Sequence, residues 1–244
     1  VIIALLLSTT EELHLKRTLH HRFEWNMIKK ISFVGIPNGL ENGMFQLGKV
    51  LLLSLISSFG TAAITANAVG NAITFLQILP GTAISLGMTP VIARCVGAGE
   101  EDQARYYNRK LLSISYLSLG IWTLLILVFL TPILRLYNLS PETMQLAKNL
   151  VRIHAYCGLA IWPIAFNLPV TLRAAGDARF TMVISIISMW AFRLFLGYVL
   201  GRHFQMGVIG VWIAMIIDWV FRTIFFVWRY RSGRWLNYSI IQQE

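Results

Sequence analysis

The chain alternates between long apolar stretches and short polar or basic segments. Six stretches of about twenty apolar residues stand out, and an α-helix of that length crosses roughly 30 Å of bilayer hydrocarbon. They cover approximately 31–57, 63–89, 111–134, 151–172, 180–201 and 207–228. Because lipid cannot hydrogen-bond a free backbone group, such segments cross a membrane as helices. The pattern predicts an all-α integral membrane protein built as a six-transmembrane-helix bundle.

Composition supports a membrane protein over a soluble helical bundle. Hydrophobic residues make up 56% of the chain and charged residues only 13%, against about 25% charged residues in ordinary soluble domains. The apolar residues also stand in continuous blocks, whereas a soluble helix would carry them on one face only.

The formal net charge of +10 comes from basic residues whose positions indicate membrane topology and not nucleic-acid binding. The basic residues lie in short loops between spans and do not follow one helical face with interleaved aromatic residues. If the amino-terminal segment is cytoplasmic and the chain crosses six times, the cytoplasmic segments hold fourteen Lys and Arg and the opposite side holds four. By the positive-inside rule, both ends of the chain are predicted to be cytoplasmic.

The first residues, VIIALLLS, form an apolar run that is too short to cross a membrane. No basic segment or small-residue cleavage site marks a signal peptide there. We therefore expect residues 1–30 to hold the end of a preceding transmembrane helix and a cytoplasmic linker. A six-helix membrane lobe would follow over 31–235, with a cytoplasmic tail over 236–244.

Glu41 is the strongest candidate for ion chemistry. It lies about ten residues into the first span, hence roughly 15 Å deep. Ionisable residues at such a depth usually face a cavity and mark an ion or proton path. Helical spacing places Asn38 and Phe45 on the same face. These three residues are predicted to bind a cation or a drug, and the structural alternative is an ion pair between Glu41 and Lys49.

A second polar feature runs along the next span. Asn67, Asn71 and Thr74 follow one another at helical spacing, and Gln77 extends the stripe by a turn. Either these side chains hydrogen-bond to neighbouring helices, or they line a substrate path.

Four further residues inside the apolar zone have two interpretations each. Asp218 could bind a cation, or it could pair with Arg222 one turn later. Arg193, like Lys49, could extend to an interface along its stem or lie near a cavity. His154 is more typical of a hydrogen-bonded histidine than of a proton relay.

The sequence lacks the residue patterns that metal binding, nucleotide binding or catalysis would need. Cys95 and Cys157 show no metal-ligand spacing and are expected to be free thiols. No phosphate-binding G-x-x-x-x-G-K-[ST] loop is present, so transport would have to be secondary. A membrane-embedded enzyme would need a nucleophile or a metal set, and H-E-x-x-H does not occur. We predict neither catalytic residues nor a cofactor.

Four motifs resemble those of a transporter family. They are GIPNGLENGMFQLGKV in the first span, PVIARCVGAG after the second, PVTLRAAGDARFT after the fourth and GVIGVWIAMIIDWVFR in the sixth. In this order they resemble the carboxy-terminal lobe of the multidrug and toxic compound extrusion (MATE) transporters. The resemblance covers roughly residues 31–235.

The resemblance implies a two-lobed architecture with drug and cation sites that face a central cavity. The six spans would then be helices seven to twelve, and the amino-terminal lobe of the same protein would be a partner beside membrane lipid and small-molecule substrates. It also connects Glu41 with cation coupling, either through H⁺ or as a Na⁺ ligand, in a bacterial plasma membrane.

The function expected from this resemblance is secondary active efflux of mostly cationic drugs or toxic metabolites, by antiport with H⁺ or Na⁺. The alternative is a flippase for a lipid-linked saccharide, with a related two-lobed architecture. A flippase would line its cavity with several basic groups for the pyrophosphate. The spans offer only Lys49 and Arg193 for this role, which favours the exporter.

Overall fold

The computed structural model describes residues 24–238. Two compact units make up the chain, residues 1–33 and 34–244. Within the first unit, the described residues form the opening turns of helix α2. The bundle and its cavity belong to the second unit. The predicted end of a preceding helix and most of the predicted linker lie outside the described residues.

The described residues are helical almost throughout and include no strand. The α-helices are α2 (Trp25–Ser57), α3 (Thr61–Gly97), α4 (Glu101–Arg135), α5 (Pro141–Trp162), α6 (Leu168–Ala174), α7 (Ala178–Ser188) and α8 (Gly207–Arg231). Three π-helical stretches, η1 (Pro163–Asn167), η2 (Met189–Leu196) and η3 (Val199–His203), continue α5 and α7, and a 3₁₀ turn, η4 (Arg234–Tyr238), follows α8. This confirms the predicted all-α class.

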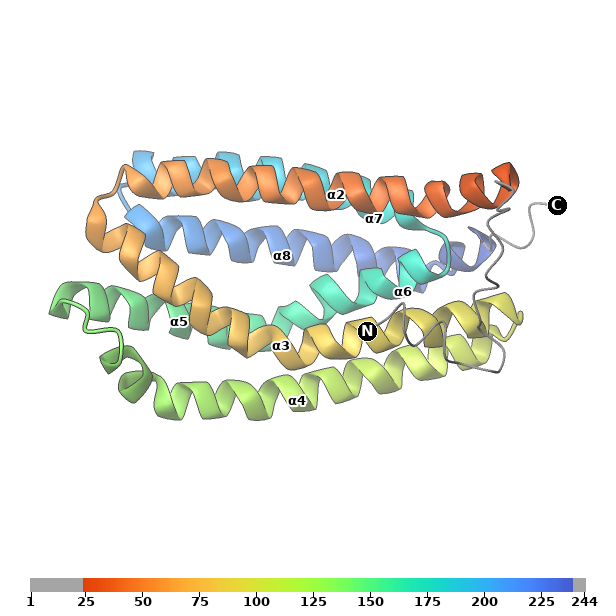
Figure 1. Cartoon of the computed structure of the whole chain (residues 1–244), viewed down its shortest axis with the longest axis horizontal. Coiled ribbons are helices and arrows are strands. Elements are labelled where there is room, and N and C mark those ends of the chain that lie inside the picture. The colour runs from red at the N-terminus through yellow and green to blue at the C-terminus, as the bar shows by residue number, and fades with distance from the viewer. Residues whose placement is uncertain (1–23, 239–244) are drawn as a thin grey trace, which may run out of the picture. The chain divides into compact units, whose positions relative to one another are not determined.

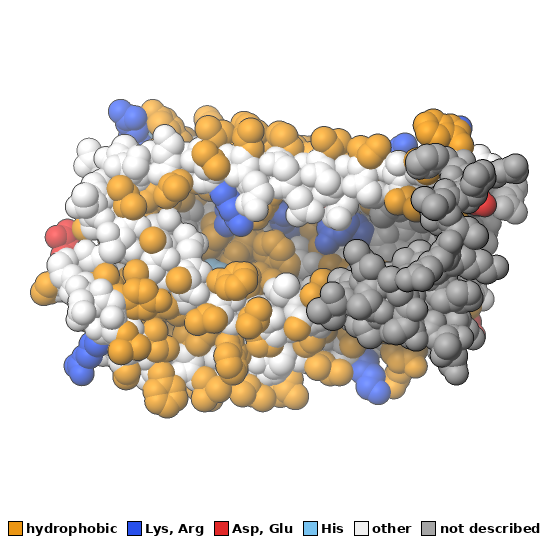
Figure 2. Space-filling model, viewed as in Figure 1, with side chains coloured by type: hydrophobic (Ala, Val, Ile, Leu, Met, Phe, Trp, Pro, Cys, Tyr) orange, Lys and Arg blue, Asp and Glu red, His pale blue; other side chains and the backbone are white. Residues whose placement is uncertain are grey.

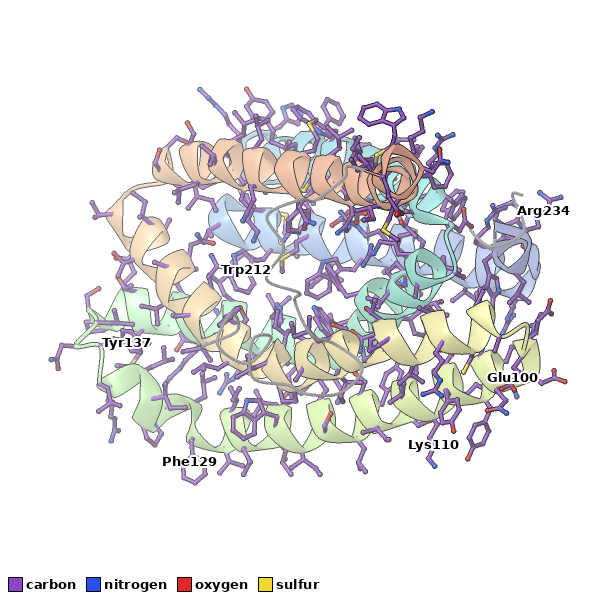
Figure 3. All side chains as sticks on the ribbon, turned by 45° about the vertical axis from the view of Figure 1, so that its right-hand side comes forward. Glu100, Lys110, Phe129, Tyr137, Trp212 and Arg234 are labelled. Atoms are coloured by element: carbon purple, nitrogen blue, oxygen red, sulfur yellow. The ribbon has the colours of Figure 1, made fainter. Side chains whose placement is uncertain are left out.

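Five helical segments of the described chain have the length and apolarity of membrane spans: Thr61–Gly97, Glu101–Arg135, Pro141–Ala174, Ala178–His203 and Gly207–Arg231. On α4, Leu117, Leu124 and Val128 are each more than 60% exposed, and Phe129 points outward from the same helix (Figure 3). Large apolar side chains on an outer face suit lipid and not water. α2 is long enough to span but carries more polar residues, so the sixth crossing stays a prediction.

The segment from α5 to α6 illustrates how sequence sets local structure. Ser140 caps α5 by accepting a hydrogen bond from the amide of Thr143, which satisfies a free donor at the helix start. Pro163 lacks an amide hydrogen, and the helix widens into the π-helical stretch η1 at this residue. η1 contains Asn167, whose side-chain amide donates to the hydroxyl of Ser115 on α4, 2.8 Å away.

The helices of the second unit pack mainly on two of their number, α3 and α8. α3 packs against α4 and α5, and α8 packs against α5, η2 and η3 (Figure 1). On α2, Gly48 is buried against Met189 of η2, and Leu52 lies beside Gly197. The space left between α2, α3, α5, η1, α6, η2 and α8 forms the cavity described next.

Candidate functional site

A cavity of about 660 Å³ opens inside the second unit. Figure 2 shows the hollow in one face of the molecule, with Lys and Arg side chains along its edge and apolar side chains inside it. Much of its wall is aromatic: Phe45, Phe75, Trp162, Phe166, Trp212 and Trp219. Ligand sites of this size, mostly apolar with a few polar groups, hold organic small molecules.

The polar stripe of α3 is divided between the cavity and the helix packing. Asn67, Asn71 and Thr74 line the cavity. The side-chain oxygen of Asn67 accepts a hydrogen bond from the indole nitrogen of Trp212, 3.0 Å away; Trp212 projects from α8 into the bundle (Figure 3). This bond fixes one wall of the cavity.

Gln77, one turn further along α3, serves the packing. Its amide donates to the Thr123 hydroxyl at 3.0 Å, and its oxygen lies 2.9 Å from Nδ1 of His154. Gln77 therefore connects α3 with α4 and α5. The His154 ring lies edge to face with Trp219 at 5.2 Å, and it also borders the cavity. Its hydrogen bond fits the interpretation of a structural histidine.

Three basic side chains line the cavity: Lys49, Arg173 and Arg193. The Lys49 ammonium and the Arg193 guanidinium each lie 5.1 Å from the centroid of the Phe45 ring. No Asp or Glu is among the lining residues of the described chain. The cavity wall is therefore positively charged.

Glu41 pairs with Arg173, not with Lys49. Its carboxylate oxygens lie 3.4 and 3.5 Å from Nη1 of Arg173. The alternative of a pair with Lys49 is wrong because eight residues of helix separate the two along α2 by about 12 Å, and Lys49 turns to Phe45 instead. α6 runs to Ala174, beyond the fourth apolar stretch that ends at 172, and so holds Arg173 within the helix. Glu41 thus reaches the cavity through Arg173.

Asp218 is completely buried in a charge cluster. It accepts hydrogen bonds from Nε of Arg222 at 2.9 Å and from the Ser188 hydroxyl, and its other oxygen lies 3.7 Å from Nη1 of Arg193. Arg222 also donates to the carbonyl of Ser185 at 3.1 Å. The predicted pair with Arg222 is confirmed, whereas the contact with Arg193 has no signal in the sequence spacing.

The candidate residues are only partly gathered in one place. Phe45, Asn67 and Asn71 line the cavity, while Asn38, Glu41 and Asp218 are not among its lining residues. Asn38 is exposed, and its carbonyl accepts a hydrogen bond from the side chain of Asn42. Within residues 24–238, no three His, Cys, Asp or Glu side chains are grouped as a metal site, and both cysteines are free thiols.

This chain is similar to proteins that are described as multidrug resistance proteins and transporters. A family model described as MatE matches residues 37–199. A probable multidrug resistance protein, NorM, of Thermotoga maritima is 27% identical over 91% of this chain and 47% of its own length. The uncharacterized transporter YisQ of Bacillus subtilis is 31% identical over 97% of this chain and 52% of its own length.

The fold also matches a solved structure. That structure, described as the outward-facing conformation of a multidrug resistance MATE family transporter, superposes with a TM-score of 0.76 and 19% identity. The match covers 88% of this chain and 49% of the other. The chain thus spans about half the length of the relatives and of the structure it matches.

Proposed function

Because this chain belongs to the MatE family, we propose that it forms one lobe, the carboxy-terminal half, of a secondary transporter that exports organic small molecules. The observation that carries this proposal is the aromatic cavity with charged groups at its wall, inside helices long enough to span a bilayer. Transporters of this kind reorient two lobes around a site near the middle of the membrane.

Coupling to H⁺ or Na⁺ is proposed at Glu41. The pair with Arg173 is long, at 3.4 Å, and both side chains keep some exposure, 15% for Glu41 and 23% for Arg173. A proton or a sodium ion on the carboxylate would neutralise it and release the guanidinium to the cavity. Ion binding at Glu41 then changes the charge that a substrate meets, and such coupling acts equally in both directions.

The sign of this coupling depends on the substrate. A released Arg173 repels a cation, which produces the exchange expected for cationic drugs. It attracts an anion, so that ion and substrate bind together, and an anionic substrate would move with the ion and not in exchange for it. The described cavity wall offers no carboxylate to a cationic substrate, so the expected preference for cations has no support in this lobe.

The test is Glu41→Gln in the full-length protein, reconstituted in liposomes with an imposed H⁺ or Na⁺ gradient. We expect the gradient-driven flux of a fluorescent aromatic substrate to fall at least about tenfold. The neutral amide can neither bind nor release the coupling ion. Glu142→Gln, the same change at an exposed residue at the start of α5, is the matched control. Unchanged flux and ion dependence in Glu41→Gln would refute the coupling role.

A lipid-linked saccharide flippase is the second candidate. It is favoured by one observation: the cavity holds three basic side chains, since Arg173 joins Lys49 and Arg193. A pyrophosphate headgroup needs such a set. Reconstituted protein that moves a fluorescent polyprenyl pyrophosphate between leaflets, and no soluble aromatic compound, would favour this candidate over the exporter.

A further inference from the structure

We propose that the cavity binds an amphipathic organic anion, with an aromatic body and a single sulfonate, phosphate or carboxylate head near Lys49 and Arg193. This inference rests on the proposed function only in treating the cavity as the substrate site. It specifies the charge and the shape of the ligand.

The charges around the cavity do not balance within the described chain. Arg173 is paired with Glu41, and Asp218 is shared between Arg193 and Arg222. One guanidinium charge is therefore in excess at Asp218. The ammonium of Lys49 adds a second positive charge, and its recorded contact is the ring of Phe45. Two positive charges therefore have no counter-charge among the described residues of this lobe.

The guanidinium charges at Asp218 lie where water screens them poorly, whereas Lys49 is exposed. Arg193 keeps only 11% of its side chain exposed, and Arg222 keeps 3%. A charge removed from water without a full partner is costly, and an incoming counter-ion recovers part of that cost. A second organic cation in the same space would add to the repulsion.

Two buried donors of the lining residues lack a hydrogen-bond acceptor in the described structure: the indole nitrogen of Trp219 and Nη1 of Arg193, whose contact with Asp218 is 3.7 Å long. One acceptor of the lining residues, the side-chain oxygen of Asn167, lacks a donor. Buried donors normally have a partner, and the head of an anion offers several acceptor oxygens. These two donors match an anion, whereas a cation such as an ammonium would bring further donors, for which the described wall offers the one unpartnered oxygen of Asn167.

The remainder of the wall suits an aromatic body. Trp162 and Phe166 stack with their ring centroids 5.2 Å apart, and Phe166 meets Trp219 edge to face at 5.6 Å. A planar ligand can extend these ring contacts, because aromatic pairs favour stacked and edge-to-face arrangements. The basic side chains at one part of the cavity and these rings at another define an amphipathic ligand.

The experiment compares two probes of similar shape and opposite charge, naphthalenesulfonate and naphthyltrimethylammonium, by isothermal titration calorimetry on the full-length protein. We expect the anion to bind at least about tenfold more tightly than the cation. Lys49→Gln should weaken anion binding by about tenfold or more. Glu41→Gln should strengthen it, because Arg173 is then free to contact the anion.

The matched control is Lys110→Gln, which removes the same charge from an exposed residue of α4 outside the cavity (Figure 3). It should leave both affinities unchanged. Equal or tighter binding of the cation would overturn the proposal, as would equal effects of Lys49→Gln and Lys110→Gln. Binding is measured without a gradient, so the two proposals can fail separately. If the unaltered protein binds the anion but shows no ion-coupled flux, the transport role is refuted and this inference stands.

The anion could come from solution or from a lipid headgroup, and nanodiscs separate the two sources. Phosphatidylglycerol in place of phosphatidylcholine should weaken naphthalenesulfonate binding if a lipid headgroup occupies the same site. Equal affinity in both nanodiscs assigns the site to soluble anions. If phosphatidylglycerol lowers the naphthalenesulfonate affinity of Lys49→Gln and of the unaltered protein by the same factor, the lipid acts at another site. That result would rule out a lipid headgroup as the source of the anion.

Discussion

Asp218 holds two guanidinium groups inside the bundle, and its removal would leave both without a counter-charge. The carboxylate has no exposed surface and contacts Arg193, Arg222 and Ser188. Such a group stabilises the fold less through its own ion pairs than through the penalty that its loss would impose on its partners.

We therefore predict that Asp218→Asn lowers the free energy of unfolding by about 3–5 kcal/mol. Denaturant unfolding in detergent micelles measures this change. Asp102→Asn is the control, because Asp102 is exposed in the first turn of α4 and its loss should cost less than about 1 kcal/mol. Equal stability of the two variants would show that Asp218 does not hold the cluster together.

At the residue scale, the sequence predicts which side chains are unusual but not which partners they find. Glu41 and Asp218 stand out because charges are rare in apolar spans, and the partner of Asp218 at i+4 follows from helix geometry. Arg173 and Arg193 come from distant segments, so their contacts depend on how the helices pack. Arg173 directly follows the fourth apolar stretch, 151–172, so the sequence does not place it inside a span, whereas α6 continues to Ala174.

Among the elements, α8 and η3 approach each other at Gly210. A Cβ built at Gly210 would lie 2.8 Å from the carbonyl carbon of Leu200 and 2.9 Å from the amide nitrogen of Gly201. Both are backbone atoms, so a side chain at this position cannot be accommodated by a rotamer change. Small residues permit this kind of close helix packing in membranes.

Gly210→Ala should accordingly destabilise the protein by about 1–3 kcal/mol, the usual cost of overpacking. Gly87→Ala is the matched control on α3, since a Cβ there meets nothing within 4 Å. Alanine should stabilise that helix by up to about 1 kcal/mol. Thermal unfolding of both variants in detergent tests the contrast, and an increase in stability for Gly210→Ala would contradict the close approach.

The elements themselves were largely predictable from apolar length, because a membrane span needs a continuous run of about twenty residues. Their ends were not, since α3 and α4 extend well beyond the apolar stretches. The π-helical stretches also escaped prediction. Pro163 marks the beginning of η1, but η2 contains no proline and no other local signal.

At the scale of the whole molecule, the distribution of basic residues predicts which end of the bundle faces the cytoplasm. Glu100 lies between α3 and α4, and Tyr137 follows α4, so the two residues are at opposite ends of that helix (Figure 3). By the positive-inside rule, the Glu100 end is predicted to be cytoplasmic.

Cysteine labelling in intact cells tests this orientation. In a variant that lacks Cys95 and Cys157, an impermeant maleimide should modify Tyr137→Cys from outside and leave Glu100→Cys unmodified until the membrane is broken. Both positions are exposed to a reagent at the membrane surface. The reverse labelling pattern would contradict the predicted topology of the chain.

The most direct test of the account is to locate a ligand in the cavity. A crystal of the full-length protein soaked with a brominated naphthalenesulfonate would show the bromine in an anomalous difference map. We predict that the bromine lies among the aromatic residues, with sulfonate oxygens about 3 Å from Lys49 or Arg193. A bromine peak outside the cavity, or a sulfonate turned away from both basic side chains, would contradict the account.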